Sequence, residues 1–332
     1  MALTPEVDMT NSTYPAPPFD TELKPVLDVV LQAFNSSLHP EDIPGLRSGG
    51  FTPGVEELVK GRPIEHFELS IPGPQGAPDL LLSVFRRTDH VTPGPAFFFT
   101  HVGGLIFGDR FVGIAPIVNY VEQFDAVVVT VEYRLAPENP APAQVEDAYA
   151  ALKWTAEHAG ELGFDPAKLI AVGGSAGGGL AAAITLKARD DSDGPALAGQ
   201  LLMYPMLDDR NETVSSHQID GIGVWDRTSN FTGWNAVLGD RRGTDDVSAY
   251  EAPSRATDLS GLPPTYLEVG SAEVFRDEIV AYASSIWAAG GSADLHVWAG
   301  GFHLYELVAA DTVIGAASRE ARTSWVRRTL GL

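Results

Sequence analysis

The sequence predicts an α/β fold built on a mostly parallel, doubly wound sheet, with an antiparallel pair of strands at its N-terminal edge. Short, continuous apolar runs alternate with segments of helical periodicity through the middle of the chain. Such runs are typical of strands that crossover helices bury on both faces. Near residue 64, apolar and polar residues instead alternate with a period of two, as in a half-buried hairpin. These two patterns in this order indicate a hairpin followed by βαβ units.

The expected elements follow the chain in order. Prolines make the first twenty residues loop-like, and apolar spacings of three and four then predict a helix over 23–34. Further helices are expected at 145–159 and 176–188. The hairpin strands are predicted at 66–71 and 80–85, and the later strands at 96–100, 126–131, 169–172, 200–204, 265–269 and 294–298.

Two segments do not follow this alternation. We expect residues 1–60 to form an N-terminal cap segment and residues 61–332 to form the core domain, with a cap or lid insertion at about 208–250. The insertion carries large aromatic side chains among polar residues, and ordinary helices that complete the core are the alternative interpretation. The aromatic residues of the insertion, Trp225, Phe231 and Trp234, are expected to line an apolar substrate pocket together with Phe107.

Composition excludes several classes of function. The formal net charge is −22, from 44 acidic and 22 basic residues, so the surface repels nucleic acids and anionic membranes. The chain has no cysteine, which excludes disulfides and thiolate nucleophiles. The N-terminus lacks the pattern of a secretory signal, and no apolar run approaches the roughly 20 residues that span a bilayer. We therefore expect a cytoplasmic protein without nucleic-acid or membrane partners.

The segment Gly173-Gly174-Ser175-Ala176-Gly177 is the candidate for a nucleophile turn. Its pattern, G-x-S-x-G, is weak evidence alone, but here it lies between a predicted strand and a predicted helix. Small neighbours let two chain segments approach closely, and the helix N-terminus directs partial positive charge to the serine. The alternative interpretation is a serine that only caps the helix.

Backbone donors for an oxyanion are expected in the loop His101-Val102-Gly103-Gly104, directly after a predicted strand. Acyl transfer develops negative charge on a former carbonyl oxygen, and preorganised N–H groups stabilise it. The donors we expect are the N–H groups of Gly103, Gly104 and Ala176. His101 is more consistent with a residue that holds this loop by hydrogen bonding than with a proton carrier.

A base and an acid are expected after later strands. His303, in a glycine-containing loop after the last predicted strand, is the candidate base, and His217 in the insertion is its only serious competitor. Chain order places the acid after the strand that ends near residue 269 and before the base. Glu273, Asp277 and Glu278 all satisfy that condition.

These motifs resemble those of the hormone-sensitive-lipase-like esterases, the bacterial family IV type, over about residues 85–310. The oxyanion loop is similar to the family's HGGG motif, the nucleophile turn to its GDSAGG motif, and residues 133–138 (YRLAPE) to a further conserved stretch. Residues 273–278 (EVFRDE) correspond to the family's D-P-L-R-D-E, which implies that Glu273 is the acid and replaces the usual aspartate. Val102 departs from the family pattern where it has a glycine, and Gly174 where it has an aspartate.

The resemblance implies an α/β-hydrolase fold with a helical cap, and a carboxylesterase for small or short-acyl esters without a metal or organic cofactor. Relatives that dimerise make a homodimer possible. Ser175 would attack the ester and form an acyl-enzyme, with His303 as base. A lactonase or amidase with the same residues, and a non-catalytic small-molecule receptor on the same scaffold, are the alternatives.

Overall fold

The computed structural model describes residues 14–48, 52 and 54–332 of the chain. Its centre is one eight-stranded sheet in the order β1-β2-β4-β3-β5-β6-β7-β8. β1 pairs antiparallel with β2, β2 pairs antiparallel with β4, and all later pairings are parallel. This confirms the predicted fold class. The strands are β1 (Ile64–Ile71), β2 (Leu80–Arg87), β3 (Gly94–Thr100), β4 (Val127–Val131), β5 (Phe164–Gly174), β6 (Gly199–Met203), β7 (Thr265–Gly270) and β8 (Ala293–Trp298).

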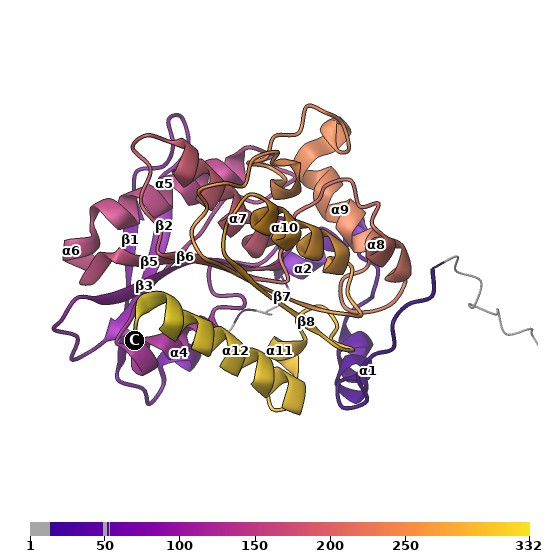
Figure 1. The fold of residues 1–332 in the computed structure, drawn as a ribbon, viewed down its shortest axis with the longest axis horizontal. Coiled ribbons are helices and arrows are strands. Elements are labelled where there is room, and N and C mark those ends of the chain that lie inside the picture. The colour runs from indigo at the N-terminus through magenta and orange to yellow at the C-terminus, as the bar shows by residue number, and fades with distance from the viewer. Residues whose placement is uncertain (1–13, 49–51, 53) are drawn as a thin grey trace, which may run out of the picture.

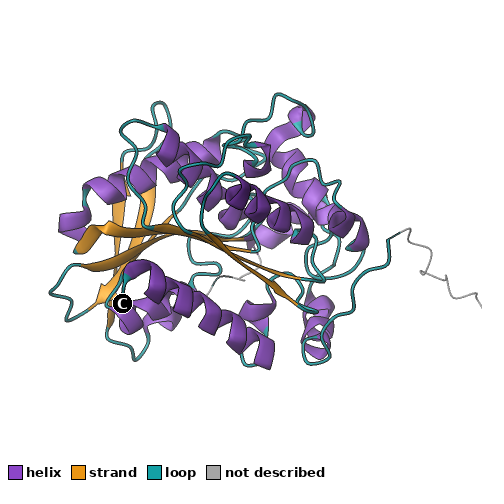
Figure 2. Cartoon of the chain, viewed as in Figure 1, coloured by secondary structure: helices purple, strands orange, loops and turns teal. Residues whose placement is uncertain are grey.

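Helices cover both faces of the sheet, which appears as a layer between them (Figures 1 and 2). The long helices α4 and α12 lie on one face, and α5, α7 and α10 lie on the other. The helices are α1 (Lys24–Ala33), α2 (Ile43–Ser48), α3 (Val55–Val59), α4 (Ala115–Phe124), α5 (Ala143–Glu157), α6 (Ala159–Leu162), α7 (Ser175–Asp190), α8 (Val214–Gln218), α9 (Arg227–Leu238), α10 (Arg276–Ala288), α11 (Tyr305–Val308) and α12 (Val313–Leu330).

The central strands are apolar because both of their faces are covered. Every residue of β4 and β6 is buried, and so are the three consecutive phenylalanines of β3, residues 97–99. β5 is longer than predicted, since its first residue, Phe164, already pairs with Gly94 of β3, and a register shift separates this pair from the next one, Ala96 with Leu169. Such an irregular start carries no continuous apolar run that sequence reasoning detects.

The two segments outside the alternation contact each other. The backbone N–H of Leu38 donates to Ser229 Oγ at 2.9 Å, and Thr232 on α9 donates to the Leu38 carbonyl at 2.7 Å. Leu23, the N-cap residue of α1, and Leu27 within this helix pack against Phe302. These contacts support a cap made from both segments, and the domain boundaries stay a prediction. Residues 1–13, 49–51 and 53 of the expected cap segment lie outside the described residues.

Parallel pairing brings the ends of four strands to one edge of the sheet. β3, β5, β7 and β8 all run in the same direction, so the loops that follow them lie close together. In open α/β sheets this carboxyl edge is where ligands bind. Within the described part of the chain, none of the helices has the length and apolar character needed to cross a membrane.

Candidate active site

Ser175 stands at the sharp turn between β5 and α7. Its φ is +54°, in the left-handed region that residues other than glycine rarely adopt. Glycines make this turn possible: a Cβ on Gly173 would lie 2.1 Å from the Gly177 carbonyl oxygen. A Cβ on Gly177 would lie 2.1 Å from the carbonyl oxygen of Thr100, at the end of β3. The strained turn therefore fixes the hydroxyl at the carboxyl edge of the sheet.

His303 and Glu273 lie in line with this hydroxyl. The Ser175 Oγ is 3.0 Å from His303 Nε2, and His303 Nδ1 is 2.7 Å from Glu273 Oε1. The other carboxylate oxygen of Glu273 accepts a hydrogen bond from the Gly270 N–H at 3.3 Å. All three side chains are buried. With Nδ1 protonated towards the carboxylate, Nε2 is free to accept the serine proton, which is the arrangement that acyl transfer requires.

The competing candidates lie elsewhere. Asp277, in the first turn of α10, accepts the Ser215 N–H at 2.7 Å and pairs with Arg276 at 2.8 Å. Glu278 is buried and accepts backbone hydrogen bonds from the loop after β6, and burial raises the pKa of its carboxyl well above the ordinary value. His217 contacts a glutamate of the insertion at 3.1 Å. Of the sequence candidates, the structure brings only Glu273 to the His303 imidazole.

The loop after β3 lines the same cavity as Ser175. Gly103 and Gly104 have φ values of +126° and +61°. The Gly103 carbonyl accepts the N–H groups of Ile106 and Phe107 at 3.0 Å each, which closes a tight turn. In the described residues, no hydrogen bond uses the N–H of either glycine. Ala176 is the second residue of α7, where a helical N–H has no partner within the helix. The backbone N–H groups of Gly103, Gly104 and Ala176 therefore have no acceptor among the described residues.

His101 holds this loop in place. Its ring stacks on Tyr133 with centroids 4.1 Å apart and an interplanar angle of 8°. Its Nδ1–H donates to the Val102 carbonyl at 2.7 Å, and the Tyr133 hydroxyl donates to the His101 carbonyl at 2.9 Å. Burial lowers the pKa of His101, which favours the neutral ring. These contacts fit the expected structural interpretation of His101.

A cavity of about 410 Å³ opens beside Ser175 and His303. Its walls are mostly apolar and include two of the predicted pocket residues, Phe107 and Trp225. Sequence reasoning missed the walls given by α1, the following loop, α2 and α11, although Val30 and Phe34 belong to the apolar stripe that predicted the first helix. The apolar residues that these segments contribute are Val30, Phe34, Leu38, Leu46, Leu304, Leu307 and Val308, and Val112, Ala115 and Val224 complete the set that was missed.

Two predicted pocket residues do not line this cavity. Phe231 is half-buried on α9, with the guanidinium groups of Arg227 and Arg242 over its ring at 4.7 and 4.6 Å. Trp234 is buried on the same helix and lines a second, much smaller cavity of about 20 Å³ beside Ala176. Their role in substrate binding stays a prediction, because their side chains on α9 have other surroundings than that of Trp225.

No group of three or more histidine or carboxylate side chains is arranged to hold a metal ion among residues 14–48, 52 and 54–332. The titratable groups gathered at the cavity are those of the Ser175–His303–Glu273 line. The arrangement therefore suits proton transfer between a hydroxyl and an imidazole that a carboxylate holds in place.

The chain is similar to known hydrolases and esterases. Residues 97–307 match the family model described as the alpha/beta hydrolase fold. The chain is 34% identical to Esterase LipI of Mycobacterium tuberculosis (strain ATCC 25618 / H37Rv) over 231 residues, which are 69% of this chain and 71% of the relative. It is 32% identical to Carboxylesterase NlhH of Mycobacterium tuberculosis (strain CDC 1551 / Oshkosh) over 289 residues, 86% of this chain and 88% of the relative.

A similar solved structure is named "Bacterial Heroin Esterase". It superposes with a TM-score of 0.86 at 36% identity and covers 94% of this chain and 98% of its own. The similarity therefore extends beyond the sheet to the segments that form the cavity.

Proposed function

The chain belongs to the α/β-hydrolase family, in its hormone-sensitive-lipase-like branch of carboxylic ester hydrolases, and from that premise we propose that Ser175, His303 and Glu273 are its catalytic triad. One observation carries the proposal: the unbroken line from Ser175 Oγ through both imidazole nitrogens to the carboxylate, at 3.0 and 2.7 Å. A serine that merely capped α7 would need neither the positive φ nor the buried imidazole.

In the proposed reaction, His303 Nε2 takes the proton of Ser175 as Oγ attacks the ester carbonyl carbon. The carbonyl oxygen becomes an oxyanion, which accepts hydrogen bonds from the N–H groups of Gly103, Gly104 and Ala176. The tetrahedral intermediate collapses when His303 returns its proton to the alcohol oxygen, and the alcohol leaves. His303 then removes a proton from water as its oxygen attacks the acyl carbon, and the second tetrahedral intermediate breaks its bond to Ser175 Oγ, which takes the proton back from His303 as the acid leaves. Glu273 holds the tautomer and stabilises the imidazolium.

The cavity supports an ester with an apolar body, such as an aromatic or alicyclic group. Besides Ser175 and His303, its only polar lining side chain in the described residues is that of Asn35, and none is charged. An apolar wall excludes charged substrates because burying an unpaired charge is costly.

Steady-state hydrolysis of p-nitrophenyl esters from acetyl to decanoyl tests the proposal. We expect turnover of the short esters, and Ser175→Ala should abolish it while the circular dichroism spectrum stays unchanged. Turnover that persists in Ser175→Ala would contradict the assigned nucleophile. A folded wild-type protein without turnover of any ester would instead favour a receptor, or an enzyme for lactones or amides.

A further inference from the structure

Tyr204, the residue directly after β6, packs against the imidazole of His303. The two rings meet edge to face, with centroids 5.1 Å apart and planes at 79°. Tyr204 is buried, its φ is +39°, and its hydroxyl donates to Glu306 Oε1 at 2.7 Å. A buried tyrosine held at both its backbone and its hydroxyl is a rigid support for whatever its ring touches.

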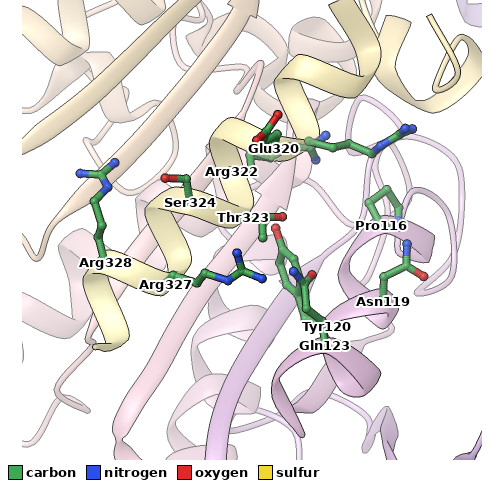
Figure 3. Close-up of a pocket in the computed structure, with 11 residues that line it drawn as sticks. Pro116, Asn119, Tyr120, Gln123, Glu320, Arg322, Thr323, Ser324, Arg327 and Arg328 are labelled. Carbon is green, nitrogen blue, oxygen red and sulfur yellow. The ribbon is translucent and has the colours of Figure 1, made fainter. Parts of the chain in front are cut away.

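Glu306 belongs to a buried cluster of charges on the inner side of α12. Arg322 Nε lies 3.0 Å from Glu268 Oε1, and Arg322 Nη1 lies 3.9 Å from Glu306 Oε1. Each of these three residues is 1% exposed. Figure 3 shows Arg322 on α12, at the groove that this helix forms with α4. Burial, together with the nearby carboxylate of Glu268, raises the pKa of Glu306 to about 7.

Such a cluster anchors Tyr204 because breaking it is costly. Two carboxyl groups share one guanidinium away from water, so the removal of a partner leaves a buried polar group unsatisfied. The hydroxyl of Tyr204 bonds one of those carboxyl groups. The position of its ring is therefore fixed from the core outwards to His303.

Gly174, immediately before the nucleophile, leaves the space that this tyrosine occupies. A Cβ at position 174 would lie 3.2 Å from Tyr204 Cε2 and 3.3 Å from its Oη. It would also lie 3.1 Å from Val102 Cγ1. The two departures from the family pattern, Val102 and Gly174, thus meet next to Tyr204.

We propose that Tyr204, anchored by Glu306, is a positioning residue that holds the His303 imidazole in line with Ser175. This rests on the proposed function, in which His303 is the base. Glu273 fixes Nδ1 of the imidazole but leaves the ring free to tilt about that bond. The rings of Tyr204 and Phe275 limit this tilt, and the centroid of Phe275 lies 5.3 Å from that of His303. Of these two rings, that of Tyr204 is also held by a hydrogen bond to a buried carboxyl group.

The test compares Tyr204→Phe with Tyr266→Phe. The Tyr266 hydroxyl bonds Glu268 Oε2 of the same cluster at 3.1 Å and is equally buried, but its ring packs on His296 and Trp325. Both variants lose one buried hydroxyl, so both should lower the melting temperature. Only Tyr204→Phe should lower kcat for p-nitrophenyl acetate, by about tenfold with KM unchanged, because sub-ångström misplacement of a base slows chemistry rather than binding. It should also shift the Hδ1 proton resonance of His303.

Equal kcat values in the two variants would overturn the inference. If Tyr204→Phe does not fold, Glu306→Gln and Glu306→Leu replace it. Glutamine keeps an acceptor for the Tyr204 hydroxyl and should retain kcat, whereas leucine removes that acceptor and should lower kcat. Equal kcat for these two would likewise overturn the inference. His303→Ala, assayed alongside, separates the failure of the proposed triad from the failure of the role of Tyr204, since turnover in that variant would refute the triad itself. An inactive His303→Ala with an unimpaired Tyr204→Phe would refute only the role of Tyr204.

Discussion

The two sides of the candidate site are built in different ways. At the carboxyl edge of the sheet, positions are set by backbone pressed against backbone, as where Gly177 leaves no space for a Cβ beside the Thr100 carbonyl. On the cap side, the cavity wall is made of apolar side chains from separate segments, such as Val30 of α1 and Leu307 of α11. We infer that the first side determines the rate of chemistry and the second determines which ester binds.

The largest effect expected on the sheet side is that of Glu273→Gln. The glutamine cannot stabilise an imidazolium and can present its amide to Nδ1, which favours the wrong tautomer. We expect kcat to fall by roughly 10³- to 10⁴-fold, as when the acid of a serine triad is lost. Asp277→Asn is the matched control and should stay within about twofold of wild type, because Asp277 bonds Ser215 and not the imidazole. A larger loss in Asp277→Asn would contradict the assigned acid.

A smaller but still large effect is expected from Gly177→Ala. The new methyl group would meet the Thr100 and His101 carbonyl oxygens at 2.1 and 2.4 Å, so the end of β3 and the loop after it have to move. We expect kcat to fall by about 10- to 100-fold through displaced oxyanion donors, together with a lower melting temperature.

Gly160→Ala is the control for this substitution. Gly160 lies in α6 with nothing within 4 Å of a Cβ at that position, so alanine should leave kcat unchanged and stabilise the helix by about 0.5–1 kcal/mol. If Gly177→Ala were equally neutral in kcat and melting temperature, close backbone packing would not be what fixes this side of the site.

The smallest effect is expected on the cap side, from Val30→Trp. An indole at this wall of the cavity takes up space that a long acyl chain or bulky alcohol would need. We expect KM for p-nitrophenyl decanoate to rise several-fold while kcat for p-nitrophenyl acetate stays within about twofold. Val29→Trp is the control, because Val29 is 64% exposed on the same helix. A drop in kcat for p-nitrophenyl acetate in Val30→Trp would contradict the inference that the cap side affects only which ester binds.

This distinction also explains what could be predicted from the sequence. The strand positions, the mostly parallel sheet and the candidacy of Ser175 and His303 could be anticipated, because continuous apolar runs and glycine-bounded turns are local signals. The predicted helix over 23–34 agrees with α1, and its apolar stripe included two residues of the cavity wall.

The cavity itself could not be predicted in the same way. Residue type alone predicts that Phe231 and Trp234 line the same pocket as Trp225. The direction in which helix α9 points each side chain is not encoded in residue type. The Tyr204–Glu306 contact spans 102 positions of the chain and joins residues with no shared motif. Contacts of that kind depend on how the whole sheet assembles.

The most direct test of the central claim is to trap the nucleophile. A fluorophosphonate reacts with an activated serine hydroxyl and stays attached, so peptide mass spectrometry of the labelled protein identifies the attacking residue. We expect one adduct per chain, on the peptide that contains Ser175, loss of esterase activity in proportion to labelling, and no adduct in Ser175→Ala or His303→Ala. An adduct on another residue that accompanies the loss of activity, or equal labelling of Ser175→Ala, would contradict the account.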